Sequence, residues 1–293
     1  MTKNSQHWLE TTWHLPKQDV DDFQTQLTVL GCLGSYEKMV LDTEEEARRT
    51  LSEFIAYFPD GNPDSLHKQL DSLQTKICLL HVVNRIPQAE WATEWKKYFK
   101  PFFLTPEIVI RPSWENYTAQ GNEKIVTLDP GMAFGTGQHD TTRFCAEIIC
   151  DLAHQMKNLS LIDVGCGSGI LSIIAKKVGF TTVTGFDMDP AAVETSLENL
   201  VRNPDVGAVI FFQNDGGLGN LGLNPADVVV SNIIAETLCE LKMDLLNLVK
   251  KNGFLVLSGI MSQRENMVKS AFSDLVLVEE KKSQDWHAYL YQK

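Results

Sequence analysis

The sequence lacks the cysteine and histidine spacing of a metal or disulfide site. Its six cysteines are scattered without a Cys-x-x-Cys pair, and its seven histidines show no ligand spacing among themselves. Zinc sites and disulfide frameworks are both recognised by such spacing. We therefore expect buried, reduced thiols and no metal ion.

Long apolar runs are also missing. No run approaches the roughly 18 residues that a membrane-spanning helix needs, and the N-terminus lacks the apolar stretch of a secretory signal. The content of 43% hydrophobic and 22% charged residues is that of an ordinary globular chain. We expect a cytoplasmic protein with no membrane partner.

Basic residues are in the minority, with 26 Lys and Arg against 38 Asp and Glu, for a formal net charge of −12. Binding to a phosphate backbone requires clustered positive charge. We therefore expect no direct contact with nucleic acid. A basic protein partner fits this charge, and acidity that only maintains solubility explains it equally well.

The length of 293 residues indicates two domains. In the first part, hydrophobic periodicity and turn residues predict the order strand, helix, strand, strand, helix, strand over residues 7–15, 18–30, 35–41, 50–58, 65–73 and 76–83. This is the split-βαβ, ferredoxin-like order, which occurs with many functions. We expect a small α+β domain over residues 1–85.

Residues 86–104 have the pattern of a linker helix, with Trp91, Trp95 and Phe99 at four-residue spacing. We interpret this aromatic stripe as packing of the linker on a neighbouring domain rather than as a ligand cage.

From residue 105 to residue 293, strands and helices alternate as in a parallel sheet covered on both faces. The expected parallel strands are the apolar runs 160–164, 182–186, 209–212, 228–231 and 254–258. Two further strands, 275–280 and 287–291, are close enough in the chain to form an antiparallel hairpin at a sheet edge. The fold class is therefore α/β, with a Rossmann-like, mostly parallel seven-stranded sheet.

The strongest short motif is the glycine-rich turn DVGCGSG at residues 163–169, between the predicted strand 160–164 and a helix predicted over residues 170–178. Gly165, Gly167 and Gly169 allow a tight turn and a close approach of a ligand to the helix N-terminus. The dinucleotide-binding pattern would have glycine where Ile170 stands. Asp163 would repel a pyrophosphate but attract a cationic ligand.

Acidic residues follow the next predicted strand. Asp187 stands where an acid in this class of fold hydrogen-bonds the ribose hydroxyls of an adenosine group. Asp189 precedes Pro190 and is interpreted as the N-cap of the helix running to Val201.

Two later strands also end in polar residues. Asn214 and Asp215 either border an adenine ring or form part of an ordinary turn. Asn232 ends a buried strand, where it lies at the mouth of the ligand crevice or else caps the next helix.

These motifs together resemble the class I methyltransferases that use S-adenosylmethionine. The segment PGMAFGTGQHDTT at residues 130–142 is similar to the PGxAFGTGxHxTT signature of the ribosomal protein L-eleven methyltransferases, the PrmA family. Segments 91–101 and 231–233 resemble that family too, so the resemblance runs from about Trp91 to the C-terminus.

The resemblance implies S-adenosylmethionine as cofactor, with contacts from Thr142, Gly165, Asp187 and Asn232. It also implies methyl transfer to lysine side chains and the N-terminal amine of a large-subunit ribosomal protein, L-eleven, which the small domain recognises. Because residues 1–85 carry no motif that aligns with the family, another protein or a small molecule remains an alternative substrate. A cofactor-binding module without turnover is the other alternative, and we expect a monomer in each case.

Asn232 is the candidate catalytic residue, acting by positioning cofactor and amine. His139 is either a general base or an anchor of its loop, and anchoring is the preferred interpretation. The candidate cofactor-binding residues are Thr142, Asp163, Gly165, Gly167, Gly169, Asp187, Asp215 and Asn232.

Overall fold

The chain divides into two compact units, Met1–Phe99 and Lys100–Lys293. A computed structural model describes residues 7–16, 23, 27, 32, 34–38, 51–59, 70, 79–87, 100–129, 139–215, 217 and 221–293. No helix in these ranges combines the length and the apolar character needed to cross a bilayer.

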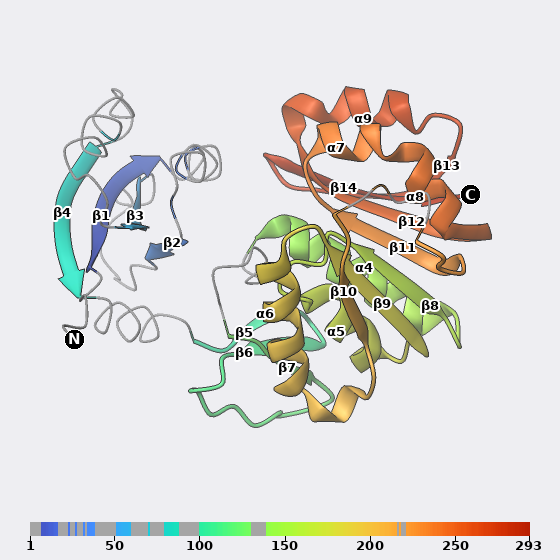
Figure 1. Ribbon diagram of the computed structural model, residues 1–293, viewed down its shortest axis with the longest axis horizontal. Helices are drawn as coiled ribbons and strands as arrows, with labels where there is room; N and C mark the ends of the chain where they lie inside the picture. The colour runs from blue at the N-terminus through green and yellow to red at the C-terminus, as the bar shows by residue number, and fades with distance from the viewer. Residues whose placement is uncertain are drawn as a thin grey trace. The chain divides into compact units, whose positions relative to one another are not determined.

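The first unit contains a four-stranded antiparallel sheet in the order β2-β3-β1-β4 (Figure 1). Its strands are β1 (His7–Pro16), β2 (Gly34–Lys38), β3 (Leu51–Pro59) and β4 (Leu79–Pro87). In a split-βαβ unit each helical crossover skips one strand, which places β1 between β3 and β4 as here. The last strand begins three residues later than predicted and ends within the range predicted for the linker.

One face of this sheet is buried because apolar residues alternate along β1 and β3. Trp13 packs edge-on against Phe23, with ring centroids 4.9 Å apart. Phe23, Leu27 and Leu70 are helical and buried, in agreement with the two predicted helices. The other residues of those helices, and the aromatic stripe 91–99, lie outside the described residues.

The second unit begins with a three-stranded sheet that the sequence patterns did not predict. It consists of β5 (Phe102–Thr105), β6 (Ile108–Arg111) and β7 (Lys124–Thr127). Strands of four residues are too short to show periodicity. β5 starts within the range predicted for the linker, and the sheet lies against the helices α4 (Asp140–Gln155) and α5 (Ile170–Val178).

The large sheet has seven strands in the order β10-β9-β8-β11-β12-β14-β13, which confirms the predicted number. The first five strands in this order are parallel, and β14 and β13 form the predicted antiparallel hairpin. The bounds are β8 (Ser160–Val164), β9 (Thr182–Asp187), β10 (Ile210–Gln213), β11 (Ala226–Asn232), β12 (Val249–Met261), β13 (Val276–Lys282) and β14 (Trp286–Gln292).

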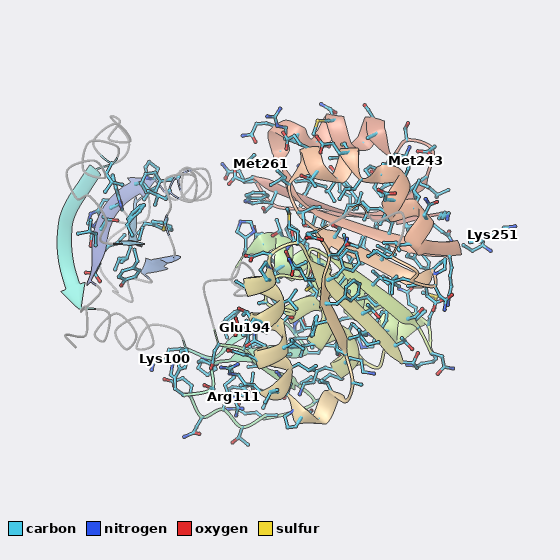
Figure 2. All side chains as sticks on the ribbon, in the orientation of Figure 1. Lys100, Arg111, Glu194, Met243, Lys251 and Met261 are labelled. Atoms are coloured by element: carbon cyan, nitrogen blue, oxygen red, sulfur yellow. The ribbon has the colours of Figure 1, made fainter. Side chains whose placement is uncertain are left out.

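Helices cover both faces of this sheet, so its central strands are apolar runs (Figure 1). One face carries α4, α5 and α6 (Pro190–Val201), and the other carries α7 (Ala235–Glu240), α8 (Lys242–Leu248) and α9 (Glu265–Ala271). Figure 2 shows the side chains that fill the two layers. The observed bounds of α5 and α6 are those predicted.

The strand order reverses between β8 and β11. In open α/β sheets, ligands bind outside the carboxyl ends of the strands at such a reversal. In Figure 2, β12 runs from near Lys251 to Met261, which shows the direction in which the carboxyl ends point. The candidate residues at the ends of β8, β9, β10 and β11 therefore share one edge of the sheet.

Candidate functional site

The glycine-rich turn after β8 has the backbone that its sequence predicts. Gly165, Gly167 and Gly169 have φ values of 75°, 53° and 76°, a region that other residues rarely adopt. The N–H groups of Gly165 and Cys166 both donate to the carbonyl oxygen of Phe186, at 2.9 and 3.0 Å. These bonds attach the loop to the end of β9, and the loop leads directly into the N-terminus of α5.

Asp187 stabilises this loop from the neighbouring strand. Its Oδ2 accepts from the N–H of Gly167 at 2.9 Å, and its Oδ1 accepts from the N–H of Asp189 at 3.0 Å. Each carboxylate oxygen has a second lone pair, so the half-buried group retains acceptor capacity for hydroxyl donors.

Asp189 has the structural role predicted for it. Its Oδ1 accepts from the N–H of Ala191 at 2.9 Å, and it is the N-cap of α6. The N-cap interpretation of Asp189 is therefore confirmed.

Asp163 lies beneath the loop and is 1% exposed. The hydroxyl of Ser172 on α5 donates to its Oδ2 at 2.7 Å. Burial raises the pKa of Asp163 to about 7 against the lowering effect of Ser172, and the nearby negative charge of Asp187 raises it further. Within the described residues no ion pair joins Asp163 to a cation. The sequence patterns did not indicate Ser172, which the turn into α5 brings to Asp163.

Asn232 ends β11 on the other side of the strand reversal. Its Nδ2 lies 3.5 Å from the hydroxyl oxygen of Thr142, and its buried Oδ1 has no hydrogen-bond partner among the described residues. The N-cap of α7 is Ile234, without any side-chain cap bond. The capping alternative for Asn232 is therefore wrong. Its Oδ1 can still accept a hydrogen bond.

Close packing fixes the turn after Asn232. A Cβ on Gly165 would lie 2.7 Å from Cγ2 of Ile233, and a Cβ on Gly259, whose φ is +81°, would lie 2.4 Å from the carbonyl oxygen of Ile233. Both glycines are thus required by close approach. The sequence shows Gly259 at the end of a predicted strand, but only the pairing of β11 with β12 reveals what it contacts.

His139 is the N-cap of α4. Its Nδ1 accepts from the N–H of Thr141 at 3.3 Å and lies 2.7 Å from the hydroxyl of Thr141, so the proton of the neutral ring is on Nε2. Its ring meets that of Trp286 edge-on, with centroids 4.6 Å apart. These contacts favour the anchoring interpretation over a general base.

Two further predicted parts of the site are the end of β10 and the signature segment 130–142. Asp215 is exposed beyond the end of β10, and the N–H of Asn214 donates to the carbonyl oxygen of Asp187 at 2.9 Å. Residues 130–138, most of the signature segment, lie outside the described residues.

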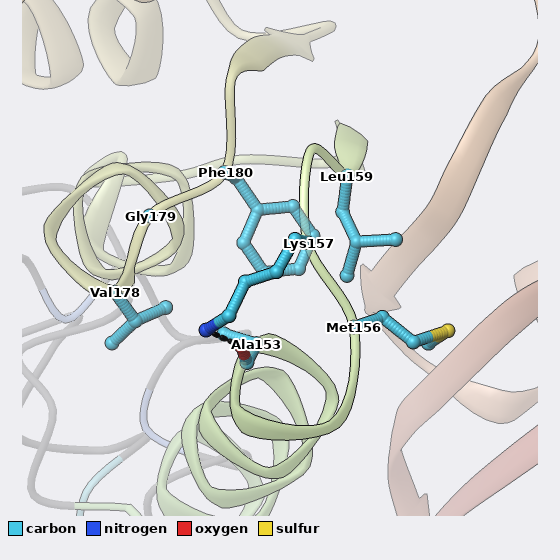
Figure 3. A pocket seen from close by; sticks show the side chains of 7 residues that line it. All are labelled: Ala153, Met156, Lys157, Leu159, Val178, Gly179 and Phe180. Carbon is cyan, nitrogen blue, oxygen red and sulfur yellow. Dashed lines mark hydrogen bonds between the residues drawn. The ribbon is translucent and has the colours of Figure 1, made fainter.

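A small hollow is present at the opposite edge of the sheet, beside the amino ends of β8 and β9 (Figure 3). Its volume is about 50 Å³, far below the roughly 300 Å³ of a small ligand pocket. Lys157 partly fills this space and donates from Nζ to the carbonyl oxygen of Ala153 at 3.3 Å. The hollow therefore has no part in the candidate site.

Glu265, Glu280 and His287 bring their ligand atoms within 4.8 Å of one another, which the histidine and cysteine spacing did not predict. The ammonium group of Lys269 already pairs with both carboxylates. The positive charge in this cluster is thus the side chain of Lys269. The absence of a metal ion stays a prediction.

No disulfide joins one described cysteine to another. Three of these cysteines are buried as predicted, whereas Cys32 and Cys239 are half-buried, and Cys78 lies outside the described residues.

The candidate edge combines a glycine turn, a carboxylate, and a buried amide oxygen that has no partner within the part of the chain that the structure describes. The chain matches the family described as ribosomal protein L11 methyltransferase (PrmA) over residues 7–293. The ribosomal protein L11 methyltransferase of Listeria welshimeri is 33% identical, over 98% of this chain and 98% of the relative. The ribosomal protein L11 methyltransferase of Bacillus cereus is 32% identical, over 97% of this chain and 98% of the relative.

A solved structure is similar as well. The crystal structure of ribosomal protein L11 methylase from Lactobacillus delbrueckii subsp. bulgaricus is 28% identical, with a TM-score of 0.59. The match covers 66% of this chain and 98% of that chain.

Proposed function

Because the chain belongs to the ribosomal protein L11 methyltransferase (PrmA) family, we propose that it methylates amino groups of ribosomal protein L11. Membership makes the protein a methyltransferase that uses S-adenosyl-L-methionine. The observation that carries the proposal is the buried Oδ1 of Asn232, which has no partner among the described residues and lies across the strand reversal from the glycine turn.

The residues at this edge fit the cofactor. S-adenosylmethionine carries hydroxyl donors on its ribose and an ammonium donor on its methionine part, and these donors need acceptors. Asp187 offers acceptor capacity for the ribose hydroxyls, and Oδ1 of Asn232 offers a buried one. Gly165, Gly167 and Gly169 leave the backbone without side chains where the cofactor would approach the N-terminus of α5.

Thr142, Asp163 and Asp215 complete the proposed site. Thr142 supports the amide of Asn232, and Asp163 supplies negative charge beneath the loop for a cationic cofactor when its carboxyl group is ionised. Asp215 follows β10, the next strand beyond Asp187, where it would border the adenine ring.

When bound, S-adenosylmethionine supplies a methyl group activated by a positively charged sulfur. The chain must present a neutral amine to it, because an ammonium group has no lone pair. Ile234, 64% exposed and two residues from Asn232, offers an apolar surface that disfavours the charged form of an approaching amine. Asn232 accepts an amine N–H at Oδ1 and so aims the nitrogen lone pair; it acts by positioning.

The division of labour follows the two units. The first unit recognises the protein substrate, and the second unit binds the cofactor and carries out methyl transfer. The net charge of −12 suits a lysine-rich protein and not a nucleic acid or an anionic membrane. We expect a cytoplasmic monomer whose targets are lysine side chains and the N-terminal amine.

Incubation with radiolabelled S-adenosylmethionine tests this proposal, with purified ribosomal protein L11 as acceptor beside other ribosomal proteins and a small-molecule extract. We expect label in L11, and far less with Asn232→Ala than with the wild type. Label only in another acceptor would support the alternative substrates. Cofactor binding without any transfer would support the binding module.

A further inference from the structure

Asn199 joins two separate segments of the second unit. It lies on the buried side of α6 and is 1% exposed. Its Nδ2 donates to the carbonyl oxygen of Ser168 in the glycine turn at 3.0 Å. Its Oδ1 accepts from the N–H of Asp129 at 3.3 Å. A backbone carbonyl oxygen can only accept a hydrogen bond and a backbone N–H can only donate one. These two partners therefore determine which side of the Asn199 amide carries the nitrogen and which the oxygen.

Asp129 is where the chain passes from β7 to the signature segment 130–142. Its carboxylate accepts from the hydroxyl of Ser113 and from Nε of Arg202, both at 2.8 Å. Asp129 is therefore held firmly, and Asn199 is the residue that relates its position to the glycine turn.

A buried amide is costly unless its polar atoms are bonded. The other buried residues of α6 are small or apolar: Ala192, Val193 and Ser196. Asn199 continues the same buried stripe, and an apolar residue would fill this position without needing partners. Its polar atoms are instead satisfied by the glycine turn and by the residue that precedes the signature segment.

We propose that Asn199 is a positioning residue of the cofactor site, which holds the glycine turn in place relative to the start of the signature segment. The inference rests on the proposed function, because it takes the glycine turn as the place where the cofactor binds. Loss of the amide releases the carbonyl of Ser168 and lets the turn move away from the geometry that the cofactor needs.

The chain provides a matched control four residues further on, just beyond the end of α6. Asn203 is equally buried, and its Nδ2 donates to the carbonyl oxygens of Thr127 and Asn199 at 2.7 and 2.8 Å. Its Oδ1 accepts from the N–H of Thr127 at 2.9 Å. Asn203 thus attaches β7 to α6 without touching the glycine turn.

The test is calorimetric titration of the full chain with S-adenosylhomocysteine, with thermal unfolding measured on the same samples. We expect Asn199→Ala to bind about tenfold more weakly and Asn203→Ala to bind within about threefold of the wild type, although it loses at least as much thermal stability. In turnover, Asn199→Ala should raise KM for the cofactor and leave kcat nearly unchanged. A purely structural defect would instead lower kcat with the folded fraction.

The failures are distinguishable. If Asp187→Ala in the same titration binds like the wild type, the proposed cofactor site itself is wrong. If Asp187→Ala binds weakly but Asn199→Ala binds normally, or if Asn203→Ala is weakened as much as Asn199→Ala, the inference about Asn199 is overturned.

Amide hydrogen exchange on the wild-type protein gives the same answer where Asn199→Ala does not fold. Saturation with S-adenosylhomocysteine should slow exchange of the Asp129 amide, which Asn199 binds, more than exchange of the Thr127 amide, which Asn203 binds. Equal changes at the two amides would overturn the inference.

Discussion

Replacing Asp163 by asparagine should stabilise the protein at neutral pH and remove part of its pH dependence. Asparagine has nearly the shape of the protonated acid and still accepts from the hydroxyl of Ser172, which lies 2.7 Å from Oδ2. The substitution therefore removes the ionisation of a buried group while its packing is kept. Asp163 is suited to this test because it is 1% exposed.

The sign follows from the direction of the shift. Burial raises the pKa of Asp163 from 3.8 to about 7, so the unfolded chain releases this proton more readily than the folded one. Stability is thus lost as pH rises from the unfolded value to the folded value, and the loss levels off above it. Each pKa unit corresponds to about 1.4 kcal/mol. The raised pKa therefore lowers the unfolding free energy by roughly 4 kcal/mol at pH 8, where the carboxyl is ionised in both states, and by about 2 kcal/mol at pH 5, where only the unfolded chain has released the proton.

The groups around Asp163 do not reverse the expected loss of stability with rising pH. Ser172 faces Asp163 from α5, Cys145 from α4, Cys166 from the glycine turn and Asp187 from β9. Burial raises the pKa of Cys145 to about 12 and that of Cys166 higher still, so both thiols stay neutral through the pH range of the test.

Urea unfolding of the wild type and Asp163→Asn at several pH values between 5 and 8 measures the effect. The stability difference in favour of Asp163→Asn should grow by about 2 to 3 kcal/mol across this range. Ser172→Ala should move the midpoint of that growth to higher pH, because the hydroxyl stabilises the ionised form. A difference that is constant with pH, or that shrinks as pH rises, would refute the argument.

Three further outcomes are expected. Asp187→Ala should weaken S-adenosylmethionine binding strongly, since each charge-assisted hydrogen bond to a ribose hydroxyl is worth about 1.5 to 3 kcal/mol. Asp189→Ala should instead lose about 1 kcal/mol of stability from its N-cap and keep its affinity for the cofactor. If calorimetry finds the weaker binding in Asp189→Ala, the ribose role moves to Asp189. Gly259→Ala should unfold more easily than Gly207→Ala, because both have positive φ but only Gly259 would clash with Ile233; equal melting temperatures would contradict this. A shortened chain beginning at Trp91 should bind cofactor yet lose methylation of ribosomal protein L11, and full activity would contradict a recognition role for the first unit.

Much of the second unit could be predicted from local sequence. The bounds of β8, α5 and α6 were predicted, because each begins or ends at a strong local signal: an apolar run, a glycine, or the Asp189–Pro190 pair. The positive φ values in the glycine turn likewise depend only on the residues that occupy it. The short strands β5, β6 and β7 were missed because four residues do not establish a period.

The site itself depends on contacts between residues far apart in the chain. The sequence places Asn232 at the end of a strand but leaves its role open. Only the structure shows Thr142, 90 residues away, beside its amide and, among the described residues, no partner at its Oδ1. No motif or periodicity in the sequence distinguishes Asn199, although it bonds Asp129, 70 residues away.

The physical reason is that a helix, strand or turn is selected mainly by its own residues, whereas a buried polar group is stable only with a partner that the fold brings to it. Local pattern therefore determined which residues end the strands of this protein. The order of those strands in the sheet decided which of these residues meet, and which polar atoms were left for a ligand.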